Sequence, residues 1–259
     1  MKWSSSARRD EIRAAALAVG LVMLALVGCA PLRPLTGLPE GAPPDFPAAA
    51  YRRAAAAGGA VYRVDPERSR VVVHVHRAGR LAKLGHDHVV ASHAVQGLAA
   101  RGAGGEGRAD LYFALASLRV DEPELRAAAG LEKELSDSDV EATRRNMLQK
   151  VLEAEGHPYV RLRVTAVDEQ AAHAIVSARL SVHGVTREFE IPAEIIASDG
   201  ALRARGAFRV RQTDFGMTPY SALGGALRVA DELDVRFDVR ATRWRFAAAP
   251  SPAEEIDGM

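Results

Sequence analysis

Histidine is the residue type best placed to do chemistry in this 259-residue chain. His74 and His76 project from one face if their segment is a strand, and the run His86-Asp87-His88 places two imidazoles around a carboxylate. Such spacing can bind Zn²⁺ or Cu²⁺ through neutral ring nitrogens, so His86 and His88 are candidate metal ligands. The alternative is structural, with His74 and His76 on a polar outer face and the loop hydrogen-bonded to itself. Five of the eight histidines belong to this cluster: His74, His76, His86, His88 and His93.

Other catalytic and binding classes find little support. No Gly-x-Ser-x-Gly nucleophile elbow is present, and the glycines between 102 and 107 are more typical of a hairpin turn than of a phosphate-binding loop. A single cysteine excludes an intramolecular disulfide, a four-cysteine zinc site and a paired-thiol redox centre. A formal net charge of +1 offers no electrostatic case for a nucleic-acid partner. We therefore expect no enzymatic activity and no required cofactor.

The one cysteine, Cys29, ends a patterned N-terminal segment. After a charged start, residues 14–28 form an uncharged apolar run, shorter than the span of about 20 residues that a membrane helix needs and suited to a signal peptide. The sequence Leu26-Val27-Gly28-Cys29 resembles the bacterial lipoprotein cleavage box, in which the cysteine is acylated. We expect a signal peptide over 1–28, a lipid anchor on Cys29, and a location in the bacterial envelope on the periplasmic face of the outer membrane. A buried cysteine in an anchoring helix is the alternative.

The rest of the chain divides into a tether, a domain and a tail. Residues 29–59 are rich in Pro, Ala and Gly, a composition that favours a semi-extended tether. Residues 247–259 are similarly loose and are expected to form a flexible tail. One folded domain is therefore predicted over 60–246.

Within that domain, apolar and polar residues alternate with period two, which is typical of strands with one buried face. His183-Gly184 predicts a tight hairpin turn, since glycine readily adopts positive φ. A count of about eight strands favours an antiparallel barrel or sandwich. Nine candidate segments give this approximate count: 61–64, 71–76, 89–99, 108–118, 159–168, 174–182, 185–191, 202–211 and 233–241.

One helical insertion interrupts the strands. Ser138 to Glu141 reads as a capping box, and apolar residues then recur at helical spacing as far as Leu152. Gly156 and Pro158 are expected to end this helix. A shorter helix is expected around 122–129, and both should pack on the sheet.

Four segments, in this order, carry a resemblance to a known family. They are Tyr62-Arg63-Val64-Asp65-Pro66-Glu67-Arg68-Ser69, Glu155-Gly156-His157-Pro158-Tyr159-Val160, Leu180-Ser181-Val182-His183-Gly184-Val185-Thr186-Arg187 and Thr213-Asp214-Phe215-Gly216-Met217. Together they are similar to the YceI-like family of bacterial envelope proteins over nearly all of 60–243. The resemblance implies an all-β fold, an eight-stranded antiparallel lipocalin-like barrel whose apolar cavity holds a polyisoprenoid chain such as a quinone tail. The chain departs from the family at Leu84-Gly85-His86-Asp87-His88-Val89, where many members carry Gly-x-Phe.

Three functions follow as hypotheses. The first is a membrane-tethered, non-enzymatic binding protein for a polyisoprenoid or another long apolar lipid. The second is a metal-binding envelope protein that uses the cluster from His74 to His93, and the third is a structural or stress-response interaction module. An eight-stranded barrel can enclose one slim ligand or be filled by its own side chains, so the alternatives stay open at this point. The predicted lining residues face inward from the strands: Val73, Val75, Phe113, Leu115, Leu180, Val182, Phe208, Val210, Val235 and Phe237.

Overall fold

The computed structural model describes residues 41–102, 106–170, 173–198 and 200–245. All of these residues belong to one compact unit, which spans Leu35–Met259. The predicted signal peptide, Cys29 and the tail from 247 lie outside the described residues. Among the helices that are described, none has the length and apolar character needed to cross a membrane.

Most of the described chain is β-structure. The helices are α2 (Ala48–Ala56), α3 (Pro123–Ala128) and α4 (Asp137–Asn146), and α4 continues into a π-helical turn, η4 (Met147–Val151). Single 3₁₀ turns are η1 (Pro66–Arg68), η2 (Ala82–Leu84), η3 (Leu115–Ser117), η5 (Thr213–Phe215) and η6 (Leu223–Gly225). The strands are β1 (Ala60–Val64), β2 (Arg70–Ala78), β3 (His88–Ser92), β4 (Gln96–Arg101), β5 (Gly107–Ala114), β6 (Arg119–Val120), β7 (Tyr159–Gln170), β8 (His173–Val182), β9 (Val185–Ala197), β10 (Ala201–Arg211), β11 (Ser221–Ala222) and β12 (Leu227–Arg243).

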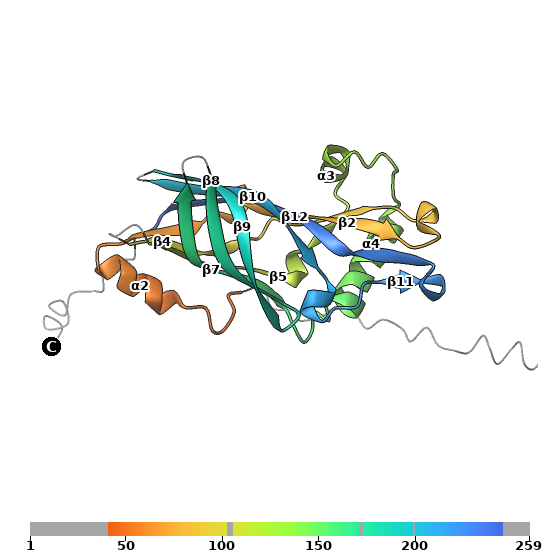
Figure 1. Cartoon of the computed structure of the whole chain (residues 1–259), viewed down its shortest axis with the longest axis horizontal. Helices are drawn as coiled ribbons and strands as arrows, with labels where there is room; N and C mark the ends of the chain where they lie inside the picture. Colours follow the sequence, from red (N-terminus) through yellow and green to blue (C-terminus); the bar gives the residue numbers. More distant parts are fainter. Residues whose placement is uncertain (1–40, 103–105, 171–172, 199, 246–259) are drawn as a thin grey trace, which may run out of the picture. The chain divides into compact units, whose positions relative to one another are not determined.

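Eight strands close into an antiparallel barrel (Figure 1). Their order is β1-β4-β5-β7-β8-β9-β10-β12, and β12 pairs back onto β1. The closing register places Tyr62 opposite Arg243 and Val64 opposite Ala241. Closure leaves no exposed sheet edge in this ring. The predicted eight-stranded antiparallel barrel is confirmed.

Strand β12 extends the wall beyond the closed ring. It is 17 residues long, and it pairs with β1 near its C-terminal end and with β2 along its earlier part. Strand β3 pairs with β2, and β6 pairs with β3. The predicted continuous strand over 89–99 is therefore wrong, since β3 ends at Ser92 and β4 begins at Gln96. The Ser92 hydroxyl accepts the Ala94 N–H at 3.3 Å, a local side-chain contact that competes with the strand ladder.

Two further boundaries differ from expectation. The predicted strand over 108–118 ends at Ala114, where η3 begins and the Ser117 hydroxyl donates to the Ala114 carbonyl at 2.7 Å. Helix α4 has Ser136, not Ser138, as its N-cap, because the Ser136 hydroxyl accepts the Asp139 N–H. The short helix expected around 122–129 is confirmed as α3.

Helix α2 corrects the prediction that all of 29–59 forms a tether. It packs on the outside of the barrel through Tyr51, which is fully buried against Val61, Leu98 and Ala100. The Tyr51 hydroxyl donates to the buried Asp110 carboxylate at 2.7 Å. Composition favours an extended chain here, but the helix packs on the barrel through Tyr51, with Phe46, Ala54 and Ala55 in the same apolar cluster.

Replacing Tyr51 with phenylalanine should lower the free energy of unfolding by about 1–3 kcal/mol, because Asp110 then loses one of its buried donors. Arg163 still donates to Asp110 at 2.6 Å, which limits the loss. Tyr62→Phe is the matched control, since its hydroxyl makes only a 3.3 Å contact with the Ser198 carbonyl. Urea unfolding of both variants checks the prediction, and a larger loss in Tyr62→Phe would contradict it.

Candidate functional site

An apolar cavity of about 360 Å³ lies inside the barrel. Every strand of the closed ring contributes to its lining, together with β2, β3 and residues of η3, α4 and η4. Its volume falls within the range of about 300–1,000 Å³ that is typical of small-molecule sites. The structure therefore favours an enclosed ligand space over a barrel filled by its own side chains.

The predicted lining residues all lie on the wall of this cavity. Leu115 lines the cavity from η3, just after β5 ends, and the other nine lie on strands. Sequence alternation found these nine because residues two apart on a strand share a face. It missed Met147, Val151 and Leu152, which close one end of the cavity from η4 and the residue after it. Their helical spacing was visible in the sequence, but only tertiary packing shows that they face the barrel interior. That the lining residues contact a ligand stays a prediction.

Polar groups reach the cavity mainly near its two ends. Arg101 lines it at the β4–β5 hairpin, where it pairs with Gly107. The guanidinium of Arg108 lies on the outer face instead, where it donates to Asp110 at 3.1 Å and lies over the Tyr51 ring. Strand β5 runs from this hairpin toward Leu115, which packs with Leu148 of η4, so Arg101 lies at the opposite end from η4. His88 and Tyr220 also line the cavity, as does Gln212, whose amide donates to the Ala230 carbonyl at 2.8 Å. A mainly apolar site with few polar groups can hold a long apolar molecule and orient its polar end.

His88 is held by a buried carboxylate. Its Nδ1 lies 2.5 Å from Asp121 Oδ2, and Asp121 also accepts the Val89 N–H at 3.0 Å and Arg126 Nη1 at 2.8 Å. Burial by itself would raise the pKa of the Asp121 carboxyl, but its hydrogen bonds with His88, Val89 and Arg126 outweigh burial and lower it. The carboxylate therefore stays ionised, and Nε2 is the His88 nitrogen left for another partner.

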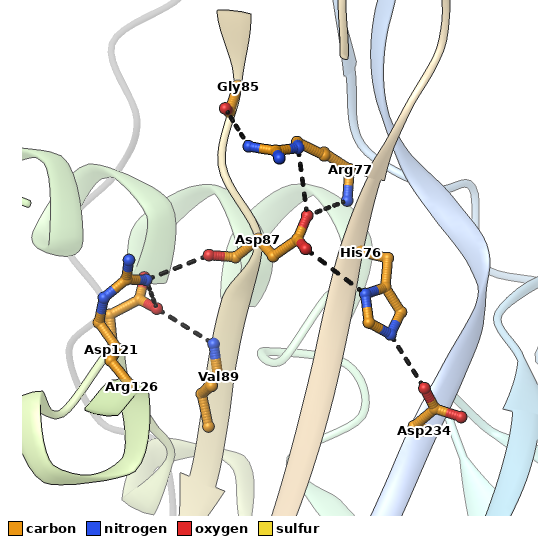
Figure 2. A network of polar contacts seen from close by, with 8 residues as sticks. All are labelled: His76, Arg77, Gly85, Asp87, Val89, Asp121, Arg126 and Asp234. Atoms are coloured by element: carbon orange, nitrogen blue, oxygen red, sulfur yellow. Dashed lines mark hydrogen bonds and ion pairs between the residues drawn. The ribbon is translucent and has the colours of Figure 1, made fainter. Parts of the chain in front are cut away.

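The segment from His86 to His88, which leads into β3, makes hydrogen bonds and ion pairs on two sides. Figure 2 shows those of its central residue, Asp87. The Asp87 carboxylate accepts the Arg77 N–H at 2.9 Å and lies 3.6 Å from His76 Nδ1. Its backbone carbonyl accepts Arg126 Nη1 at 3.1 Å. The loop is thus bound to strand β2 on one side and to helix α3 on the other. These contacts match the structural interpretation of the histidine-rich stretch.

The five clustered histidines do not meet at one point. His76 Nε2 lies 2.9 Å from Asp234, and His93 Nε2 lies 2.7 Å from Glu122. Only the His86 and His88 rings touch, edge to face, with centroids 4.7 Å apart. Burial lowers the pKa of His86, and neighbouring His88 adds to that effect. Within the described ranges, no third metal donor converges on this pair, and metal binding by His86 and His88 stays a prediction.

A different group of metal-type donors appears elsewhere in the fold. One donor atom each from Glu153, His157 and His183 lie within 4.8 Å of one another. Two of the three occur in the motif segments noted in the sequence, but their spacing along the chain does not show that they meet. The hairpin turn predicted at His183-Gly184 is confirmed, with φ of 52° and 73°.

Comparisons with known proteins agree with the fold. The model of the YceI-like domain matches residues 62–241. The crystal structure of Burkholderia cenocepacia BcnA is 13% identical, with a TM-score of 0.50, over 69% of this chain and 99% of that one. A structure from Saccharophagus degradans, described as a polyisoprenoid binding domain implicated in plant cell wall breakdown, is 13% identical with a TM-score of 0.49, over 71% and 98%.

A mutant YceI protein of Campylobacter jejuni is 16% identical, with a TM-score of 0.42, over 58% of this chain and 82% of that one. No curated protein sequence matches the chain. At such low identity, the likeness to BcnA shows the fold alone. The family assignment rests on the domain model, which spans more than half of the sequence and confirms the resemblance seen in the motifs. The chain belongs to the YceI-like domain family.

Proposed function

We propose that the barrel binds a polyisoprenoid chain, or another long apolar lipid, as a carrier or a shield and not as an enzyme. The cavity of about 360 Å³, lined almost wholly by apolar side chains, is the observation that carries this proposal. Transfer of a hydrocarbon chain from water into such a cavity gains about 25 cal/mol per Å² of apolar surface removed from water. Membership of the YceI-like family supports a polyisoprenoid as the first candidate.

The polar lining suggests how such a ligand would lie. An apolar chain would occupy the middle of the barrel, where Phe208 stacks edge to face between Phe189 and Phe237. A polar head group would lie at one end, where hydrogen-bonding groups are available. His88 is the better placed of these, because its contact with Asp121 fixes the ring and leaves Nε2 to donate or accept.

A titration with two ligand series tests the proposal. Full-length protein stripped of lipid is titrated with isoprenoid alcohols of increasing length, and with saturated fatty alcohols of the same lengths as a control. We expect affinity to rise with chain length in both series and to be higher for the isoprenoids. Equal affinity in the two series would limit the site to long apolar lipids in general. No binding in either series would contradict the proposal.

A lipid anchor at Cys29 would hold this barrel at a membrane. We propose that Cys29 is acylated and holds the protein at the periplasmic face of the outer membrane. Each acyl chain adds about 0.8 kcal/mol per buried CH₂, and multiple chains give stable attachment. A lipid-binding barrel on such an anchor would have its ligand pool beside it.

Replacing Cys29 with serine should abolish acylation and move the protein from the membrane fraction to the soluble fraction. Membrane fractionation, together with the intact mass of the mature protein, checks this expectation. Ala30→Ser is the matched control, since it changes the neighbouring residue and keeps the thiol. Unchanged fractionation of Cys29→Ser would overturn the anchor.

A further inference from the structure

A group of metal-type donors lies next to the end of the barrel that η4 closes. It contains Glu153, His157 and His183, with one donor atom from each within 4.8 Å of the others. Glu153 and His157 come from the turn that follows η4, while His183 opens the turn between β8 and β9. Two segments far apart in the sequence therefore bring an imidazole–imidazole–carboxylate set together.

The ring of His183 is oriented as a metal ligand would be. Its Nδ1 lies 3.2 Å from the Phe215 carbonyl, which can only accept, so Nδ1 carries the proton. Nε2 therefore presents a lone pair; it is buried and has no hydrogen-bond partner among the described residues. A backbone carbonyl on the other ring nitrogen is the usual arrangement that fixes the tautomer of a metal-bound histidine.

Another acceptor lies close to that lone pair. Glu153 Oε2 lies 3.5 Å from His183 Nε2. An imidazole lone pair and a carboxylate oxygen repel each other unless a cation lies between them. A proton or a metal ion between the two atoms would relieve this repulsion, and the second imidazole, from His157, adds a donor that a metal ion could use and a proton would not need.

The backbone conformation of two turns brings Glu153, His157 and His183 close together. The Glu153 carbonyl accepts the N–H groups of Gly156 and His157, at 2.9 and 3.1 Å, which makes a tight turn. Glu153 and His183 both have left-handed backbone angles, with φ of 44° and 52°, which are uncommon for residues other than glycine. A Cβ on Gly184 would lie 2.8 Å from His157 Cε1, so glycine allows the His157 ring to lie against the turn.

We propose that Glu153, His157 and His183 bind a divalent transition-metal ion of the Zn²⁺ class. Two imidazoles and one carboxylate form a donor set that suits Zn²⁺ and leaves a fourth position for water. A tetrahedral ion with bonds of about 2.1 Å places its ligand atoms roughly 3.4 Å apart. Glu153 and His183 already have this separation, at 3.5 Å, so adjustment of the His157 ring completes the set.

A bound ion would join two parts of the wall beside the cavity. Leu152 precedes Glu153 and Val182 precedes His183, and both line the cavity. The ion would link the segment after η4 to the β8–β9 turn. Metal binding therefore adds a crosslink at the closed end of the barrel, whatever molecule the cavity holds.

Calorimetric titration of the full chain with Zn²⁺, after treatment with a chelator, tests this site. We expect one ion per chain, with affinity weakened at least about 100-fold in His183→Asn and in His157→Asn. Asparagine favours the left-handed turn position, so His183→Asn should keep the hairpin. His173→Asn, which replaces the exposed histidine at the start of β8, is the matched control and should bind like the wild type.

A second readout separates this site from the other histidine pair. Co²⁺ in the wild type should give the visible absorption of tetrahedral coordination, and His157→Asn should lose it. A double variant, His86→Asn with His88→Asn, should keep both the absorption and the Zn²⁺ affinity. Absence of Zn²⁺ binding by the wild type, unchanged affinity in folded His183→Asn and His157→Asn, or loss only in the double variant would each overturn the proposal.

Discussion

Replacing Ala204 with tryptophan is expected to abolish the binding of a long apolar ligand while leaving the barrel folded. Ala204 lies on β10 and lines the cavity, between Ile195 of β9 and Val239 of β12, which line it as well. An indole there would occupy space that the ligand needs. Overpacking is costly in a tightly packed core, but here the new side chain enters a cavity of about 360 Å³.

The expected loss of affinity is about 100-fold or more, since each 1.4 kcal/mol of lost apolar burial weakens binding tenfold. Ala207→Trp is the matched control, because Ala207 is exposed on the same strand, opposite Arg236. Ligand titration and urea unfolding of both variants check the prediction. Unchanged binding in Ala204→Trp would contradict it, as would an equal loss in Ala207→Trp.

Replacing Asp121 with asparagine is expected to cost about 3–5 kcal/mol of unfolding free energy, because it leaves the Arg126 charge buried without its counter-ion. Both side chains are almost fully buried, and the two residues are joined at 2.8 Å. Asparagine suits the left-handed backbone of this position, where φ is 56°, so the variant tests the charge and not the turn.

A double variant and a surface variant test whether the stability loss in Asp121→Asn comes from the buried charge of Arg126. Asp121→Asn combined with Arg126→Met removes both charges and should recover much of the lost stability, since apolar replacements of buried ion pairs are often neutral. Asp45→Asn breaks an exposed ion pair, in which the Asp45 side chain is 70% accessible and that of Arg161 is 41% accessible. This substitution should lower the free energy of unfolding by at most about 1 kcal/mol. Equal losses in Asp121→Asn and Asp45→Asn, measured by urea unfolding, would contradict the account.

The same carboxylate predicts a pH dependence. Because its folded-state pKa is lowered, Asp121 stabilises the protein fully above the ordinary carboxyl pKa of about 3.9. That contribution is lost as the pH falls through the lower folded-state value. The difference in stability between wild type and Asp121→Asn should therefore shrink below about pH 4, and a difference that grows there would show the opposite sign.

The barrel could be predicted because its signal is local. Alternation along β8, β10 and β12 places every second side chain inward, and the cavity lining repeats that pattern. The hairpin at His183-Gly184 was also a local property, since both residues of the turn have positive φ. Alternation alone leaves both an antiparallel barrel and a sandwich possible. The order of the four motif segments then indicates one family, the YceI-like family.

Features that depend on distant contacts were missed or misplaced. The helix over 48–56 packs on the barrel with a hydrogen bond from Tyr51 to Asp110, a residue 59 positions away in the sequence. The contact of Asp121 with Arg126, five residues on, is local, but its contact with His88 depends on the pairing of β6 with β3. The residues around Asp121 in the sequence do not show that it is buried. Spacing along the chain points to His86 and His88 as metal candidates, whereas His157 and His183 come together only through the fold.

Native mass spectrometry of the full-length protein, purified without added lipid, tests the central claim most directly. We expect the wild type and Ala207→Trp to carry one long apolar lipid per chain, identified after extraction as a polyisoprenoid, and Ala204→Trp to carry none. A wild type that carries no lipid, or an Ala204→Trp variant that carries the same lipid at the same occupancy, would contradict the claim that this barrel is a binding site for a long apolar chain.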